Sequence, residues 1–148
     1  MSANRLPHCD FDPQDLHTRL RLEVPGRFDA ISPAVEQVMA VAREMECSAG
    51  KEFEIETALR EALANAIRHG CAGDDTKKVE LVVACEEARG MLIVVRDPGP
   101  GFDPGGIASP TLGHNIYRHH GRGIYLINQL MDEVSFDRGG TEIRMRKR

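Results

Sequence analysis

The chain has 148 residues, of which 41% are hydrophobic and 28% are charged, and its formal net charge is −4. This size and composition are typical of one globular domain with a sizeable core. The negative charge argues against a general nucleic-acid-binding protein, and no apolar run approaches the roughly 20 residues that a membrane-spanning helix needs.

The N-terminus and the cysteines suggest where the protein works. Residues 1–17 are polar and show no period, so we expect a loose N-terminal arm, and they lack the basic-then-apolar pattern of a signal peptide. The cysteines at 9, 47, 71 and 85 match no zinc-ligand spacing. Four cysteines could form two disulfides, but the last three adjoin apolar segments. We therefore expect buried thiols and a reducing, cytoplasmic location.

The first half of the chain predicts one strand followed by two helices. Residues 18–24, TRLRLEV, alternate between apolar and charged side chains and predict a half-buried strand. Ser32-Pro33 is typical of a helix start, with a capping hydroxyl before a proline. A second helix is predicted from about Glu52 to His69, with Gly70 as its C-terminal cap.

The second half of the chain predicts two strand pairs, which are separated by a long loop and a helix. Two strands are predicted over 77–87 and 91–97, and a loop of roughly 20 residues follows, which is unusual inside a compact domain. A third helix follows Gly123, and a strand pair closes the chain over 133–147. This order predicts a two-layer α+β sandwich, with an antiparallel or mixed sheet covered on one face by three helices.

The polar face of the second predicted helix carries groups that chemistry could use. Glu61 and Asn65 are four residues apart, so their side chains project the same way. A carboxylate and an amide carbonyl so placed could serve as a general base and a ligand for a hard cation. The alternative is an ordinary solvated helix face.

Two glycine loops add candidate ligand contacts. Asp97 ends a strand in DPGPGF, where Gly99 and Gly101 would let a ligand approach the backbone closely. In GRG, Gly121 and Gly123 stand directly before a helix, and the free N–H groups of a helix N-terminus suit phosphate oxygens. Taken singly, each loop could equally be a turn, and neither a Walker A nor a GxGxxG pattern is present.

The three elements together resemble a known set of motifs. EALANAIRHG, DPGPGFD and GRGIYLINQLMDEV stand in the order of the N, G1 and G2 boxes of the GHKL ATPase superfamily, and the similarity covers about residues 18–148. The chain is most similar to the small anti-sigma factor serine kinases, also called switch-protein kinases. The resemblance implies the Bergerat ATP-binding fold for an 18–148 domain, with ATP and Mg²⁺ as cofactors.

The resemblance also implies roles for individual residues. Asn65 corresponds to the Mg²⁺ ligand, Asp97 to the acceptor of the adenine amino group, and Glu61 to the general base. An arginine would stabilise the transition state. The residues expected at the nucleotide are Asn65, Arg68, His69, Asp97, Gly99, Gly101, Gly121, Arg122, Gly123, Ile124 and Thr141.

The length of the chain decides among members of the superfamily. We expect the arm to be too short for the phospho-accepting domain of a sensor kinase, and we expect no second domain for gyrase-like coupling. We therefore expect a kinase that phosphorylates a serine on a STAS-type anti-sigma factor antagonist and sequesters a sigma factor. The family also leads us to expect a homodimer, without nucleic-acid or membrane binding. The alternatives are a non-catalytic binding module and a weak ATPase, and the loop histidines 114, 119 and 120 are not expected to bind metal.

Overall fold

The computed structural model describes residues 18–86, 90–100 and 122–148. Within them the elements are the strands β1 (Thr18–Pro25), β2 (Lys78–Glu86), β3 (Gly90–Arg96), β4 (Glu133–Asp137) and β5 (Glu142–Lys147), with the helices α1 (Ile31–Glu44), α2 (Glu52–Asn65) and α4 (Arg122–Leu130). The short helical turns are η1 (Phe28–Ala30), η2 (Ala66–Cys71) and η5 (Arg138–Gly140). The predicted order of elements is confirmed.

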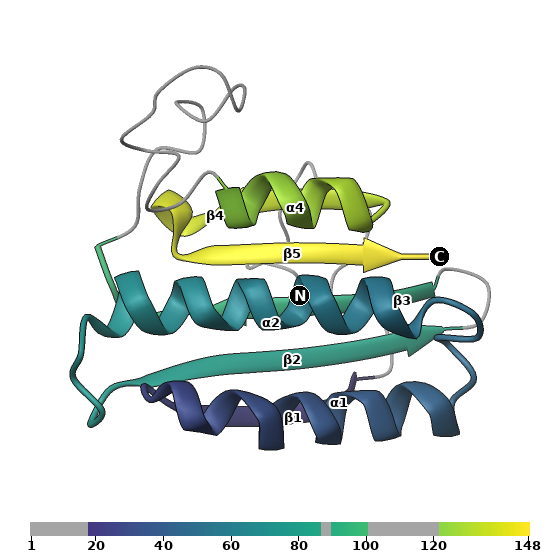
Figure 1. Cartoon of the computed structure of the whole chain (residues 1–148), viewed down its shortest axis with the longest axis horizontal. Coiled ribbons are helices and arrows are strands. Elements are labelled where there is room, and N and C mark those ends of the chain that lie inside the picture. Colours follow the sequence, from purple (N-terminus) through teal and green to yellow (C-terminus); the bar gives the residue numbers. More distant parts are fainter. Residues whose placement is uncertain (1–17, 87–89, 101–121) are drawn as a thin grey trace, which may run out of the picture.

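The strands form one five-stranded sheet in the order β1-β2-β3-β5-β4, and all neighbouring pairs are antiparallel. The three α-helices lie on one face of this sheet (Figure 1). The predicted two-layer α+β sandwich is therefore confirmed, with no parallel pair among the described strands.

Alternation along the strands gives the sheet two different faces. Side chains such as Leu81, Ile93 and Met145 point to the helices and are fully buried, where they join the main core with α1, α2 and α4. Their neighbours in sequence point to the other face, which carries a smaller apolar cluster and many charged side chains. Burial of the helix-side face is the main force that holds the two layers together.

Both helix ends predicted from capping residues need correction. α1 begins at Ile31, and its N-cap is Ala30, without a side-chain cap hydrogen bond. The hydroxyl of Ser32 instead accepts a hydrogen bond from Arg60, because η1 already leads the chain into the helix. At the end of the second helix, the residue that adopts the left-handed conformation is Ala72 (φ 52°), not Gly70.

The last turn after the second helix is π-helical, whereas the sequence predicts a continuous α-helix to His69. α2 ends at Asn65, and residues 66–71 continue as a π-helical turn, η2. π turns are rare and occur mostly as short insertions, frequently at functional sites. Here the extra residue in the turn carries His69 and Gly70 to the end of the sheet where β3 finishes.

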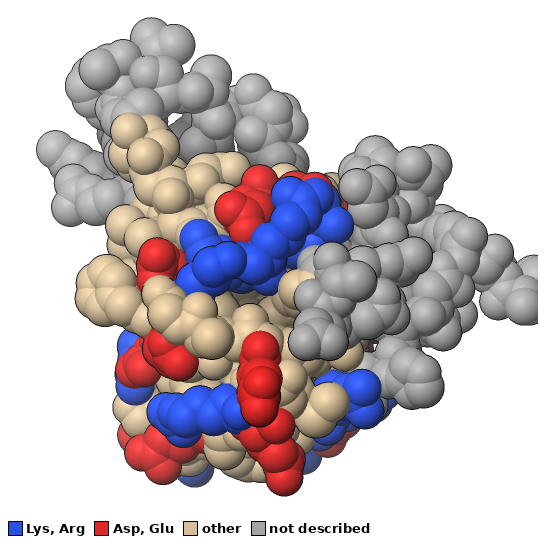
Figure 2. All heavy atoms as spheres, turned by 90° about the vertical axis from the view of Figure 1, so that its right-hand side faces the viewer, with Lys and Arg blue, Asp and Glu red and all other residues tan. Residues whose placement is uncertain are grey.

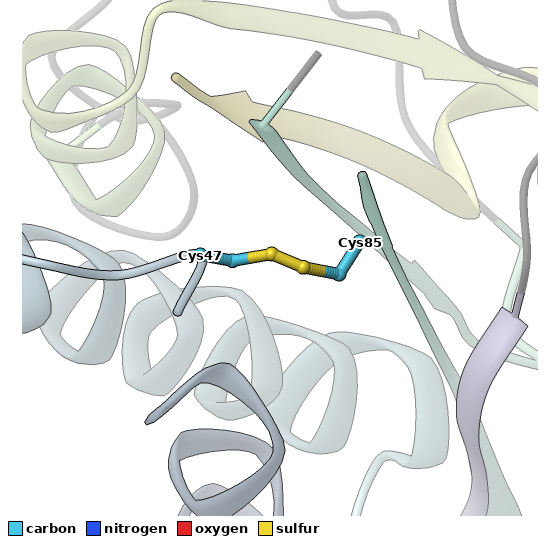
Figure 3. Close-up of a disulfide and its surroundings, with 2 residues drawn as sticks. All are labelled: Cys47 and Cys85. Atoms are coloured by element: carbon cyan, nitrogen blue, oxygen red, sulfur yellow. A yellow bond between two sulfur atoms is a disulfide. The ribbon is translucent and has the colours of Figure 1, made fainter. Parts of the chain in front are cut away.

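The prediction of buried thiols is wrong for two of the cysteines. Cys47 and Cys85 form a disulfide between the α1–α2 connection and β2, with Cα atoms 6.4 Å apart (Figure 3). A turn at Glu46 (φ 58°) folds the chain back over the helix side of the sheet, where Cys85 also points. Cys71 is a buried free thiol, as predicted. Disulfides are rare in reducing compartments, so the cysteines no longer support the predicted cytoplasmic location.

In the described part of the chain, no helix is both long enough and apolar enough to cross a membrane.

Candidate functional site

A hollow opens between α2, α4 and the ends of β3 and β5. Its empty space amounts to about 500 Å³, including the part open to solvent. Most of its wall is apolar, and four polar side chains interrupt it. The lining residues come from five elements and their connections: Ala62, Asn65, Ala66, His69, Gly70, Val95, Asp97, Ile124, Ile127, Phe136, Gly140, Thr141 and Ile143.

Asp97 stands at one end of the hollow, where two glycines surround it. The N–H of Gly99 donates a hydrogen bond of 2.8 Å to Oδ1 of Asp97, so the other carboxylate oxygen keeps its full capacity to accept. A Cβ on Gly70 would lie 2.4 Å from Cγ of Asp97, and a Cβ on Gly99 would lie 2.6 Å from Cα of Gly70. A side chain at Gly70 would therefore displace the carboxylate, and one at Gly99 would displace the backbone of Gly70.

A backbone hydrogen bond fixes the position of Asp97 in the hollow. Its N–H donates to the carbonyl of Thr141 at 2.8 Å, which ties the end of β3 to the turn before β5. Thr141 also lines the hollow, and its hydroxyl donates to the carbonyl of Arg138, so the hydroxyl oxygen can still accept a hydrogen bond. Both groups are thus held by contacts that do not depend on a ligand.

Burial raises the pKa of the Asp97 carboxyl, and the hydrogen bond from Gly99 only partly offsets this effect. A half-buried carboxylate with one oxygen unused is costly unless a donor reaches it. A ligand that brings an N–H group to this end of the hollow would supply that donor. Titratable groups with a raised pKa in a cleft are frequent at functional sites.

At the other end of the hollow, α2 meets the first turn of α4. A Cβ on Gly123 would lie 2.7 Å from Oε1 of Glu61 and 3.0 Å from Nδ2 of Asn65. The three predicted residues are therefore neighbours, although Gly123 follows Asn65 by 58 positions in the sequence. The first N–H groups of a helix have no partner within it, so this end offers backbone donors for an anion beside a carboxylate and an amide.

The structure places the other predicted site residues as follows. His69, Ile124 and Thr141 line the hollow with Asn65 and Asp97. Arg68 is exposed and lies with its guanidinium 5.5 Å from the ring centre of Phe28, and it is not among the lining residues. Gly101 and Gly121 lie outside the described residues, as do the side chain of Arg122 and the loop histidines.

Sequence reasoning missed two features of the site. Gly70 was predicted to cap a helix, yet its role here is to let Asp97 approach closely. The second feature is the apolar wall of the hollow, which includes Val95, Ile127 and Ile143 and which no sequence motif marks. The residues around Gly70 give no sign of the contact with Asp97, because this contact depends on the π turn.

The arrangement suits a flat, amino-bearing heterocycle joined to an anionic group. Branched aliphatic side chains can pack against the faces of a planar ring, and the Asp97 carboxylate can accept from an exocyclic amine. Donors at the start of α4 can meet phosphate oxygens at the opposite end. A nucleoside polyphosphate combines these three chemical features.

Any metal at this site would depend on the ligand. Among residues 18–86, 90–100 and 122–148, no group of three or more His, Cys, Asp and Glu side chains is placed to hold a metal ion. The Asn65 carbonyl oxygen is one suitable hard ligand for Mg²⁺, which commonly takes one or two protein ligands together with phosphate oxygens and water. The residues present therefore fit a Mg²⁺–phosphate complex better than a metal held by protein alone.

Comparisons with known proteins agree with this geometry. The family model of the histidine kinase-like ATPase domain matches residues 24–147. Curated relatives include proteins named serine-protein kinase RsbW from Bacillus cereus strains AH820 and Q1 and from Bacillus anthracis. Each is 25% identical over 122 residues, which covers 78% of this chain and 75% of the relative.

Proposed function

Because the chain belongs to the histidine kinase-like ATPase domain family, we propose that it binds ATP in the hollow and transfers the γ-phosphoryl group to a serine of a partner protein. One observation carries the proposal. Asp97 and Asn65 line one hollow, Asp97 can accept from an amino group, and Asn65 lies beside Glu61 and Gly123 at the N-terminus of α4.

In this proposal the adenine ring lies between the aliphatic walls, with its amino group donating to Asp97. The hydrogen bond from Gly99 and the tie to Thr141 orient the carboxylate before the nucleotide arrives, so little ordering cost remains for binding. The phosphates then point towards Asn65 and the first turn of α4, where backbone N–H groups stabilise their charge.

Glu61 is the proposed general base. It takes the proton of the partner's serine hydroxyl as the oxygen attacks the γ-phosphorus, a new O–P bond forms, and the bond to the bridging oxygen breaks to release ADP. Mg²⁺ held by Asn65 would neutralise charge on the phosphates when bound. One arginine, Arg68, Arg118 or Arg122, is proposed to stabilise the transition state.

The proposed partners are a sigma factor and a STAS-type anti-sigma factor antagonist. Two lines of support lead to them: the resemblance of the three motifs to the small anti-sigma factor kinases, and the similarity to proteins named serine-protein kinase RsbW. The proposed cellular location is the cytoplasm, and a homodimer is proposed by the same resemblance.

The kinase proposal is tested by following phosphate onto the antagonist. The protein is incubated with Mg-ATP and a candidate STAS-type antagonist, and the antagonist is weighed by mass spectrometry. Glu61→Gln should keep ATP affinity and lower the transfer rate by at least about tenfold, since a positioned base contributes roughly 10²–10⁴-fold. Glu54→Gln, on the same polar helix face but two turns away, is the matched control and should leave the rate unchanged.

Other outcomes of this experiment separate the competing functions. An unchanged rate in Glu61→Gln would remove Glu61 from the base role. ATP-dependent capture of the partner without added phosphate would favour a non-catalytic binding module. Release of inorganic phosphate without a phosphorylated partner would favour a simple ATPase.

A further inference from the structure

A row of charged side chains crosses the sheet behind the Asp97 end of the hollow. Glu80 pairs with Arg96 and Arg96 pairs with Glu142, so these residues share one row on the helix-free face, the face opposite α1, α2 and α4 (Figure 1). Because side chains alternate along a strand, the next residues of β3 and β5 point to the other face. These neighbours are Asp97 and Thr141, which line the hollow. The charged row and the hollow therefore lie back to back, with one layer of backbone between them.

Glu142 lies at the centre of this row, which ends on β4 at the buried Asp137. The Glu142 side chain is fully buried, and among the described residues it contacts three arginines. Arg96 donates to Oε1 from Nε at 2.7 Å, and Nε of Arg138 lies 3.2 Å from the same oxygen. Arg144 donates to Oε2 at 2.8 Å. One carboxylate therefore connects the end of β3, the turn η5 and the start of β5.

The Glu142 carboxylate keeps its charge despite its burial. Burial alone would raise the pKa of Glu142, but hydrogen bonds from Arg144 and Arg96 and the charges of both arginines lower it below its usual value. A buried ion pair contributes little stability compared with well-packed apolar side chains, so stability alone is a weak reason for this arrangement. Charged hydrogen bonds of fixed geometry do set where the elements that carry them lie relative to one another.

The turn between β4 and β5 has a backbone that needs such support. Arg138, Gly139 and Gly140 have positive φ angles of 54°, 67° and 91°. Glycine adopts this conformation without a steric penalty, whereas the Cβ of an arginine comes too close to the following carbonyl oxygen. The ion pair between Arg138 and Glu142 spans the turn and favours the strained conformation. The Glu142 carboxylate therefore helps to hold the shape of η5.

Two connections lead from Glu142 to Asp97. The first passes through the turn, where the carbonyl of Arg138 accepts from the N–H of Thr141 at 3.3 Å and from its hydroxyl at 2.8 Å. The carbonyl of Thr141 in turn accepts from the N–H of Asp97 at 2.8 Å. The second connection is Arg96, which precedes Asp97 in the chain and donates to Glu142. A shift of the Glu142 carboxylate would therefore displace Asp97 through both connections.

We propose that Glu142 is a positioning residue for the nucleotide site, and that it sets the positions of Asp97 and Thr141 in the hollow from the helix-free face. Glu142 is not among the residues that line the hollow, so it acts through the ends of β3 and β5. It also lies outside the three motifs on which the resemblance rests. This inference rests on the proposed binding of ATP in the hollow and adds a residue that controls how the base is recognised.

Nucleotide selectivity tests this proposal in the full-length chain. Calorimetry measures the affinity for Mg-ATP and for inosine triphosphate, whose base carries a carbonyl oxygen in place of the amino group. Glu142→Gln keeps the shape of the side chain and removes its charge. It should weaken ATP binding at least about threefold and lower the preference for ATP by a similar factor, which is near the lower end of coupling within one hydrogen-bond network. In the Asp97→Asn background it should change ATP affinity by less than about twofold.

Glu133→Gln is the matched control on the same face. Glu133 contacts Arg146 and Arg148 at the end of the sheet where the chain finishes, away from the hollow. Figure 2 faces this end of the molecule, where blue and red side chains gather. Glu133→Gln should leave both nucleotide affinities unchanged. Circular dichroism and thermal unfolding check that each variant is folded.

A second variant, Arg138→Gln, removes one ion pair of Glu142 from a half-exposed position and should weaken ATP binding at least about twofold. If Glu142 only stabilises the fold, Glu142→Gln will lower the unfolding temperature and leave the ATP preference of the folded protein unchanged, which would overturn the proposal. An equal cost of Glu142→Gln with and without Asp97→Asn would also overturn it. If Glu142→Gln does not fold, an unchanged ATP affinity in Arg138→Gln would overturn it instead.

Failure of this inference differs from failure of the proposed function. A wild-type protein that binds no ATP would overturn the proposed function together with this inference. A wild-type protein that prefers ATP, with the same preference in Glu142→Gln, would overturn the positioning role alone.

Discussion

Replacing Gly70 with alanine tests how closely the site is built around Asp97. The new Cβ would lie 2.4 Å from Cγ and 2.5 Å from Oδ1 of Asp97, where ordinary carbon–carbon contacts begin near 3.5 Å. Either the carboxylate or the π turn must therefore move by about 1 Å. The hydrogen bond from Gly99 holds one oxygen of Asp97, so this displacement also strains the loop that follows β3.

The expected cost follows from the contact that is lost. A hydrogen bond between a charged acceptor and a neutral donor contributes about 1.5–3 kcal/mol, which corresponds to roughly 10–100-fold in affinity. Gly70→Ala should weaken ATP binding by about this factor. Isothermal titration calorimetry measures it directly, and circular dichroism with thermal unfolding checks that the variant is folded.

A double-mutant cycle with Asp97→Asn shows whether the effect acts through the carboxylate. If Gly70→Ala works by moving Asp97, it should cost little more ATP affinity in the Asp97→Asn background. An ATP affinity equal to that of the wild-type protein in Gly70→Ala would show that the position of Asp97 does not depend on Gly70. Full additivity of the two substitutions in a folded double variant would refute the explanation equally, because it would mean that the glycine and the aspartate act separately.

Two further predictions concern pH and redox state. Burial raises the pKa of Asp97, so as pH falls ATP affinity should begin to fall at a higher pH than for an ordinary aspartate, and calorimetry across pH should lose this dependence in Asp97→Asn. The same group should act oppositely on stability: its contribution is fully present below the unfolded pKa and is lost as pH rises through the folded pKa, which urea titrations with and without Asp97→Asn can compare. Reducing the Cys47–Cys85 disulfide, whose residues are 38 apart, should lower the free energy of unfolding by about 2–4 kcal/mol in urea titration. Cys47→Ser with Cys85→Ser should show the same loss without reductant, and equal stability of the oxidised and reduced protein would contradict a structural role for the disulfide.

The sequence was sufficient to predict the order of the elements because each strand and helix has a clear hydrophobic period. The alternation of 18–24 matches β1, and the polar face of the second helix brings Glu61 and Asn65 together beside Gly123. These features are local. A reader of the sequence needs only the spacing of side chains along one element to find them.

The features that could not be predicted depend on contacts between distant segments. The π turn places Gly70 against Asp97, and nothing in the residues around Gly70 distinguishes this role from a helix cap. The pairing of Cys47 with Cys85 depends on the turn after α1 and on the register of β2. Local sequence preferences do not predict the contact of Gly70 with Asp97 or the pairing of Cys47 with Cys85.

Asp97 is proposed to accept a hydrogen bond from the amino group of an adenine nucleotide. Inosine triphosphate tests it most directly, because it differs from ATP in carrying a carbonyl oxygen where adenine has its amino group. The wild-type protein should bind ATP at least about tenfold more tightly than inosine triphosphate, since the lost hydrogen bond leaves a buried acceptor facing another acceptor. Asp97→Asn should remove most of this preference. Equal affinity of the wild-type protein for the two nucleotides would contradict the account.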